Sequence, residues 1–181
     1  MEKKIYIVRH CSAHGQPPEA KLTKEGHIQA KKLVEFFEDR KIERIISSPY
    51  QRAVDSIKPL SVSKGLEVEV DPRLAERVLS SNDLPDWQNK LEASFLDLDI
   101  KFDGGESSRE AINRIVSVVD EIFLREVENT IIVTHGNLMS LLINNFDKIF
   151  GFEEWKRLSN PDVFLIIEGS HFVERLWENE R

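Results

Sequence analysis

Residues 1–15 read "MEKKIYIVRHCSAHG", and the change of character within this stretch decides the fold. The apolar run at 5–8 ends abruptly at Arg9 and His10. Short apolar runs of this kind are typical of strands buried on both faces of a sheet. The sequence therefore predicts a buried strand with a cationic and an imidazole side chain at its carboxyl end.

The same pattern, an apolar run followed by polar or charged residues, occurs twice more along the chain. Residues 129–137, "NTIIVTHGN", place His135 directly after an apolar run, and residues 47–52, "SSPYQR", place Arg52 shortly after another. Parallel strands point their carboxyl ends the same way, and neighbouring strands lie roughly 4.8 Å apart. Ligands of such sheets bind outside these ends. If the three strands are neighbours, two arginines and two histidines meet in one crevice.

Hydrophobic periodicity predicts the remaining elements. Strands are expected at 4–8, 44–47, 66–70 and 130–134, with a hairpin at 162–177 around Gly169-Ser170; helices are expected at 21–40, from 48 onward, at 107–127 and at 137–146. Residues 71–105 show no clear period. Strands that alternate with amphipathic helices predict an α/β fold, a three-layer α/β/α sandwich with a mostly parallel central sheet and an antiparallel edge.

Several helix boundaries are predicted from single residues. Thr23 is expected to cap the first helix, and Ser48 the second, with Pro49 at the first helical position. Pro59 is expected to end or kink that second helix. The inward face of the long helix is expected to consist of Ile112, Ile115, Val116, Val119, Ile122 and Phe123.

Composition limits the class of protein. The chain has 181 residues, 40% of them hydrophobic, which suits one globular domain over 1–181. A net charge of −7, with scattered Lys and Arg, argues against nucleic acid and anionic membranes as partners. The apolar run near the N-terminus is too short for a signal peptide or a membrane span. Together with a single cysteine, Cys11, this predicts a cytoplasmic protein.

The convergent side chains favour phosphate chemistry. The guanidinium fork of Arg matches phosphate oxygens, and helix N-termini attract anions. A neutral imidazole can attack phosphorus and form a phosphohistidine, which divides the reaction into two steps. Glu76, after the third strand, is placed to supply a proton to the leaving oxygen. Each of these residues alone would more often be structural; their occurrence together at equivalent strand ends favours function.

Other phosphatase chemistries need residues that are missing at the required spacing. Asp97-x-Asp99 is followed by Lys101, where a haloacid dehalogenase-type phosphatase has Thr or Val. Pro17 stands at the arginine position of a Cys-x5-Arg motif beginning at Cys11. These two chemistries are therefore disfavoured.

Zinc is also disfavoured. His10 and His14 have the i, i+4 spacing of ligands on a helix, but the glycine and prolines that follow argue against a helix there. We expect neither a metal nor an organic cofactor.

Six segments in order resemble the signatures of the histidine phosphatase superfamily, which includes the cofactor-dependent phosphoglycerate mutases. They are "VRHC" (8–11), "LTKEGHIQA" (22–30), "ISSPYQRAVDS" (46–56), "RLAE" (73–76), "GGES" (104–107) and "VTHGN" (133–137). The resemblance extends from Ile5 to about Asn137. It implies a single phosphoglycerate mutase-like domain.

The resemblance also implies roles for individual residues. His10 resembles the phosphorylated nucleophile and Glu76 the general acid, with Glu106 as a second candidate. His135 resembles the second catalytic histidine and belongs to the implied phosphate clamp. The substrate-binding residues implied are Arg9, Arg52, Ser12, Gln16 and Gly136.

The chain departs from the family pattern near the expected phosphate. Cys11 stands where the family usually has Gly, Ala13 where it often has Thr or Ser, and Gln16 where it often has Asn. Ser12 and Gln16 are the expected substitutes. The chain is shorter than typical mutases, and residues 77–103 lack their substrate-binding pattern.

These points favour a metal-independent phosphatase that acts on a small phosphorylated metabolite through phosphohistidine. Two alternatives stay open: a phosphoglycerate mutase, and a non-catalytic module that binds phosphate or phosphoproteins. The sequence also leaves open a homodimer.

Overall fold

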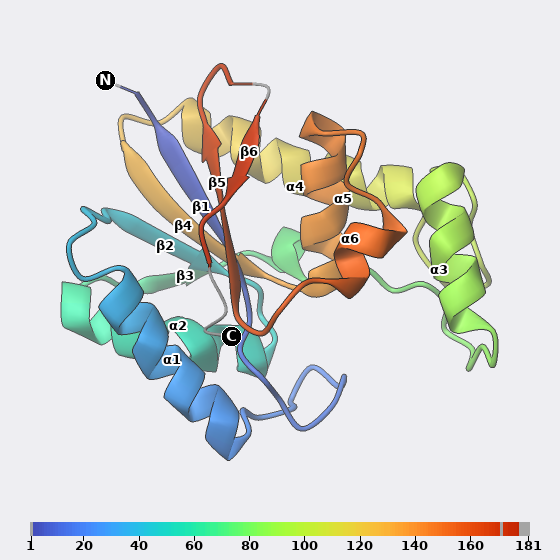
Figure 1. Cartoon of the computed structure of the whole chain (residues 1–181), viewed down its shortest axis with the longest axis horizontal. Helices are drawn as coiled ribbons and strands as arrows, with labels where there is room; N and C mark the ends of the chain where they lie inside the picture. Colours follow the sequence, from blue (N-terminus) through green and yellow to red (C-terminus); the bar gives the residue numbers. More distant parts are fainter. Residues whose placement is uncertain (1, 171, 178–181) are drawn as a thin grey trace.

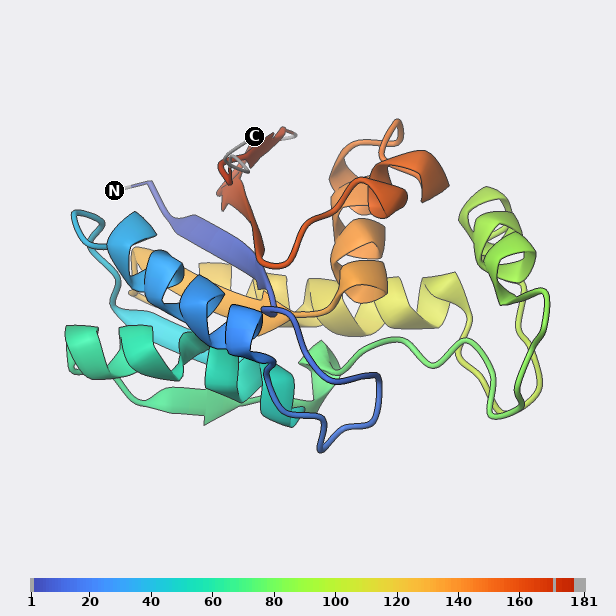
Figure 2. The same cartoon turned by 60° about the horizontal axis from the view of Figure 1, so that its bottom comes forward.

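The computed structural model describes residues 2–170 and 172–177, and Figures 1 and 2 show a twisted sheet with helices packed on both faces. In chain order the elements are β1 (Lys4–Arg9), α1 (Lys24–Phe36), β2 (Arg44–Ser47), α2 (Gln51–Lys64), β3 (Val68–Val70), a 3-10 turn η1 (Pro72–Leu74), α3 (Trp87–Leu96), α4 (Ser108–Phe123), β4 (Asn129–Thr134), α5 (Gly136–Phe146), α6 (Phe152–Lys156), β5 (Asp162–Ile167) and β6 (Val173–Arg175).

The sheet has the strand order β3-β2-β4-β1-β5-β6. Its first four strands are parallel, whereas β5 and β6 form an antiparallel hairpin at one edge. The expected turn at Gly169-Ser170 joins the two, although residue 171 lies outside the described residues. The predicted α/β sandwich with a mostly parallel sheet is therefore confirmed.

Alternation along the strands creates two separate cores. On β1, Ile5 and Ile7 face the cluster formed with α4 and α5, whereas Tyr6 and Val8 face the cluster formed with α1 and α2. Figure 1 shows α1 and α2 together on one side of the sheet. Because β1 is buried on both faces, it reads as a continuous apolar run rather than an alternating one.

The predicted inward face of α4 is confirmed. Ser107 and Glu110 form a capping box at its start, which satisfies two backbone N–H groups reciprocally. The helix ends at Phe123, earlier than expected. Its core-facing residues are Ile112, Ile115, Val119 and Ile122, with Val116 and Phe123 partly buried against the same cluster.

The start of α2 corrects the sequence-based expectation. The helix begins at Gln51, and Tyr50 precedes it with an extended backbone and no side-chain cap. Ser48 instead accepts a hydrogen bond from the Tyr50 N–H at 3.2 Å. Pro49 therefore lies in a short turn before the helix, not at its first position.

Pro59 does not end α2, which continues to Lys64. A proline inside a helix removes one backbone hydrogen bond. On the same helix, Ile57 and Leu60 are completely buried against the sheet. We infer that this packing outweighs the lost bond, because tertiary contacts supply most of a helix's stability in proteins.

The Thr23 cap is confirmed, since its Oγ1 accepts a hydrogen bond from the Gly26 N–H at 3.0 Å. Gly26 also lets the loop after β1 approach α1. A Cβ at this position would lie 2.1 Å from the carbonyl oxygen of Ser12, which is backbone and cannot move aside cheaply. The glycine is therefore required by tertiary packing, not by the helix.

No helix in the described part of the chain combines the length and the apolar character needed to cross a membrane.

Gly26→Ala should destabilise the protein, although alanine is the better helix former by about 1 kcal/mol. We expect a net loss on the order of 1–3 kcal/mol, because the new methyl group overlaps the Ser12 carbonyl. The measurement is the free energy of unfolding in urea. Lys31→Ala, at an exposed position of the same helix, is the control and should change stability little. A Gly26→Ala protein as stable as wild type would contradict this packing argument.

Candidate active site

Three strand ends meet at one edge of the sheet, as the sequence predicts. Arg9 at the end of β1 lies opposite Thr134 at the end of β4, and Ser47 of β2 lies opposite Val133. The next residues continue the pairing, since the His10 N–H donates to the Thr134 carbonyl at 3.1 Å. The side chains that follow the three strands are thereby brought into one cluster.

His10 is held in one tautomer by its hydrogen bonds. Its Nδ1 lies 2.7 Å from the carbonyl oxygen of Cys11, and its Nε2 lies 3.1 Å from Nε of Arg52. A guanidinium N–H can only donate, so Nε2 is the acceptor and Nδ1 carries the proton. Burial, followed by the positive charges of Arg52 and Arg9, lowers the pKa of His10 to about 3. The result is a neutral imidazole with its lone pair on Nε2.

Arg52 lies in the first turn of α2 and is almost fully buried. Besides the bond to His10, its Nη1 donates to the carbonyl oxygens of Gln16 and Pro17 at 2.9 and 3.0 Å. Burial lowers the pKa of Arg52, and Glu76 opposes this shift. The guanidinium thus joins the loop at 16–17 to the nucleophile candidate.

His135 lies beside His10, with ring centroids 5.1 Å apart. Its Nε2 is 2.7 Å from Oγ of Ser48, which also accepts from the Tyr50 N–H. Because the Ser48 oxygen accepts from Tyr50, its hydroxyl proton is available to Nε2 of His135. With that bond formed, Nε2 is the acceptor and Nδ1 carries the His135 proton. That Nδ1 is buried without a partner. Burial, followed by the charges of His10 and Arg52, lowers the pKa of His135 well below its ordinary value.

Glu76 follows η1 along the chain, and its side chain reaches the first turn of α5. Its Oε1 accepts from the Arg77 and Leu138 N–H groups at 2.8 and 2.9 Å, and its Oε2 accepts from the Asn137 N–H at 3.0 Å. This arrangement corrects one expectation. The first-turn N–H groups of Asn137 and Leu138 bind the Glu76 carboxylate and are not left free for an external anion.

The guanidinium of Arg9 is held by backbone carbonyl groups of the segment before β5. Its Nη1 donates to the carbonyl oxygens of Leu158 and Ser159, each at 3.2 Å. Gly136 makes room for the guanidinium, since a Cβ there would lie 3.1–3.2 Å from its atoms. Burial lowers the pKa of Arg9, whereas Glu76 and Asp162 raise it.

These residues surround a cavity of about 530 Å³. Six of the eight predicted site residues line it: Arg9, His10, Ser12, Gln16, Glu76 and Gly136. Arg52 and His135 are absent from the lining but contact His10: Arg52 donates to its Nε2, and the His135 ring lies beside its ring.

The sequence analysis placed Ala13 near the phosphate, and it lines the cavity; eight other lining residues were missed: Gly15, Arg77, Leu79, Trp87, Leu91, Asn137, Trp155 and Asn160. Arg77 and Asn137 adjoin predicted site residues, so their position along the chain was a usable signal. Asn160 donates from Nδ2 to the carbonyl oxygen of His10 at 2.7 Å. It reaches the site from the segment before β5, which shows no signal in sequence.

Several donors around the cavity have no partner. Among the described residues, buried side-chain atoms without a hydrogen bond are Arg9 Nε, Arg77 Nη2, Asn137 Nδ2, His135 Nδ1 and, away from the site, Thr130 Oγ1. Burying such a group unpaired costs free energy, so clustering of four donors needs an explanation. An anion that accepts hydrogen bonds is the complementary ligand.

Three other residues considered from the sequence, Glu106, Asp99 and Cys11, do not line the cavity. Glu106 forms a two-point ion pair with Arg114, with N–O distances of 2.6 and 2.9 Å, and does not line the cavity. Asp99 pairs with Arg109 at an exposed position. Cys11 is buried, and burial raises the pKa of its thiol to about 12. Within the described residues, no group of three or more His, Cys, Asp or Glu side chains is arranged to hold a metal.

The sequence and the fold of this chain are similar to those of known phosphatases. A protein of Hydrogenobacter thermophilus, named provisionally as phosphoserine phosphatase 2, is 26% identical over 156 residues, which cover 78% of this chain and 77% of that protein. The structure of a mycobacterial glucosyl-3-phosphoglycerate phosphatase with inorganic phosphate is 25% identical, with a TM-score of 0.73 and coverage of 90% and 88%. A phosphoserine phosphatase from Entamoeba histolytica, 17% identical, shares the fold with a TM-score of 0.77 over 98% and 97%.

The family model named "Histidine phosphatase superfamily (branch 1)" matches residues 5–167, which include every predicted site residue. This confirms the resemblance seen in the sequence motifs. The chain therefore belongs to the histidine phosphatase superfamily, branch 1.

Proposed function

We propose that this protein hydrolyses phosphomonoesters of small metabolites through a covalent phosphohistidine at His10, without a metal ion. The observation that carries the proposal is the state of His10. Its Nδ1 donates to the backbone, and its neutral Nε2 lies beside Arg52. A neutral imidazole with its lone pair on Nε2 is the form that can attack phosphorus once Arg52 donates to a phosphoryl oxygen instead.

The first step transfers the phosphoryl group to the protein. Binding of the substrate replaces the bond from Arg52 to Nε2, so that Arg52 donates to a phosphoryl oxygen instead. The Nε2 lone pair of His10 forms a bond to phosphorus as the ester P–O bond breaks. Glu76, which must carry a proton in the substrate complex, gives that proton to the leaving oxygen, and the alcohol departs.

The second step returns the protein to its starting state. Water enters opposite the P–N bond, and the Glu76 carboxylate takes one of its protons. The water oxygen bonds to phosphorus, the P–N bond breaks, and Nε2 of His10 recovers its lone pair. Inorganic phosphate is the second product.

Arg9, Arg52 and His135 supply the electrostatic part of the mechanism. Arg9 and His135 each have a buried nitrogen without a partner. Because these donors have no partner in the free protein, they can bond to phosphoryl oxygens without first breaking another hydrogen bond. Removing one donor of this kind typically lowers the rate about 10²–10³-fold. We assign Ser12, Gln16 and Gly136 to substrate binding around the transferred group and its ester oxygen.

His10→Ala should abolish turnover by several orders of magnitude, because it removes the covalent nucleophile. The measurements are hydrolysis of p-nitrophenyl phosphate and trapping of an acid-labile phosphoenzyme. His27→Ala, at an exposed position of α1, is the matched control and should retain activity. Treatment with a metal chelator should also leave activity intact. Near wild-type hydrolysis by His10→Ala would rule out this mechanism.

The free protein should show no titration of His10 in the neutral range. Burial lowers the pKa of His10 to about 3, so the ring stays neutral from pH 5 to 8 and gains a proton only in strong acid. The measurement is the NMR shift of the His10 ring as a function of pH, assigned with His10→Ala. A midpoint near 6.5 would show that this imidazole is not held neutral by the fold.

Glu76→Gln should affect substrates according to their leaving groups. An alkoxide needs a proton as its bond to phosphorus breaks, whereas nitrophenolate departs without one. We expect kcat/KM for glycerol phosphate to fall roughly 10²–10⁴-fold and for p-nitrophenyl phosphate to fall much less, provided that phosphoenzyme formation limits both.

Glu106→Gln is the control for this test. Its partner is Arg114 and it does not line the cavity, so any loss should be similar for both substrates. An alkyl-selective loss in Glu106→Gln, together with equal losses in Glu76→Gln, would transfer the acid role to Glu106.

A further inference from the structure

One end of the cavity is chemically unlike the phosphate end. The polar cluster of Arg9, His10, Glu76 and Asn137 occupies only part of a space of about 530 Å³, a volume that suits a ligand larger than a phosphoryl group. The remaining wall formed by α3, α6 and the chain leading to α3 consists of Arg77, Leu79, Trp87, Leu91 and Trp155, which we term the apolar wall.

The two tryptophans of the apolar wall come from different elements. Trp87 begins α3 and Trp155 lies in α6, and their ring centroids are 6.1 Å apart in an edge-to-face arrangement. Trp155 stacks on Phe152 with centroids 5.4 Å apart, which fixes its ring. Figure 1 shows α3 standing beside α6, away from the sheet. Trp87 remains 44% exposed, an unusual state for a large apolar side chain at a cavity wall.

Arg77 is the charged member of the apolar wall; two of its guanidinium nitrogens bond to the scaffold, and its Nη2 is buried without a partner. Its Nε donates to the carbonyl oxygen of Glu106 at 3.0 Å, and its Nη1 donates to Oγ of Ser94 at 2.8 Å. Ser94 belongs to α3, so Arg77 links this helix to the body of the protein. Apart from Arg77, the apolar wall consists of two leucine and two indole side chains, those of Leu79, Leu91, Trp87 and Trp155.

We propose that the apolar wall is a leaving-group subsite, and that the preferred substrates are phosphomonoesters of alcohols that carry an apolar chain or ring. This inference rests on the proposed function, because it places the phosphoryl group at His10. With the ester oxygen near Glu76, the rest of the alcohol extends toward Trp87 and Trp155. Burial of apolar surface there stabilises both the bound substrate and the transition state.

The test compares ethyl, butyl and 2-phenylethyl phosphate. All three release a primary alkoxide, so they make similar demands on Glu76 and differ mainly in apolar surface. Burying one methylene is worth about fourfold in affinity. We expect kcat/KM to rise about tenfold from ethyl to butyl phosphate and about 10²-fold from ethyl to 2-phenylethyl phosphate. Equal values across the series would overturn the subsite.

A binding experiment separates this inference from the mechanism. Ethylphosphonate and 2-phenylethylphosphonate cannot be hydrolysed, and calorimetry measures their dissociation constants without any turnover. Tighter binding of the phenylethyl compound by tenfold or more supports the subsite even if no phosphoenzyme forms. Equal dissociation constants would overturn the subsite even if His10 proves to be the nucleophile.

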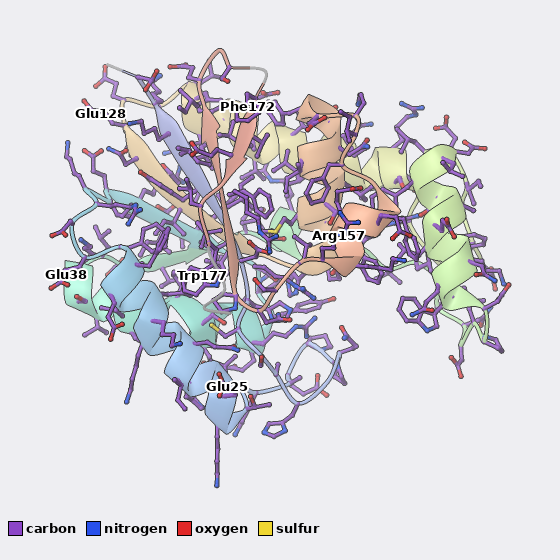
Figure 3. The ribbon with its side chains drawn as sticks, viewed as in Figure 1. Glu25, Glu38, Glu128, Arg157, Phe172 and Trp177 are labelled. Carbon is purple, nitrogen blue, oxygen red and sulfur yellow. The ribbon has the colours of Figure 1, made fainter. Side chains whose placement is uncertain are left out.

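Variants then locate the selectivity. Trp87→Ala should reduce the preference for 2-phenylethyl over ethyl phosphate about tenfold. Because Trp87 is 44% exposed, we expect the variant to fold. Trp177→Ala is the matched control. Trp177 packs on Phe36 of α1 with centroids 5.3 Å apart, and Figure 3 shows it far from α3. The control should keep the wild-type preference. An unchanged preference in Trp87→Ala, or an equal fall in both variants, would overturn the assignment.

Discussion

Parallel pairing of β1 with β4, and of β4 with β2, is the constraint on which the rest of the structure depends. It aligns Arg9 with Thr134 and Ser47 with Val133, so that three changes from apolar to polar sequence occur at the same edge. The strands can be buried on both faces because helices cover both faces. The same apolar residues that stabilise the sheet therefore also bring His10, Arg52 and His135 together.

A cluster of buried arginines and histidines opposes folding unless its members are paired or neutral. The protein meets this requirement in three ways. His10 accepts a bond from Arg52, backbone carbonyls accept from both arginines, and burial keeps both imidazoles uncharged. The donors left without partners are the part that an anion can complete. In the proposed mechanism these donors are already in place for the phosphoryl oxygens, and the bond from Arg52 to Nε2 of His10 is the one that has to be exchanged.

Local sequence signals were reliable where one short segment decides the outcome. The Thr23 cap and the core face of α4 depend on neighbouring residues, and both are confirmed. The start of α2 was predicted wrongly, because the turn at Ser48 overrides local preference, and of the two outcomes expected at Pro59 an end of the helix does not occur. Glu76 shows the same limit at the site. Its place near the strand ends followed from the sequence, but its bonds to the first turn of α5 did not.

The sequence by itself determined the α/β class, the strand-end motifs and the family, because hydrophobic period and motif spacing are properties of continuous segments. It also named the residues to which we assign the proposed chemistry. Only the tertiary structure decided which of them line the cavity and which, like Arg52 and His135, contact His10 without lining it. Only the tertiary structure revealed Asn160 and the pairing of Trp87 with Trp155. Such contacts join segments far apart in the chain, and their geometry depends on how separate elements pack, which no local pattern records.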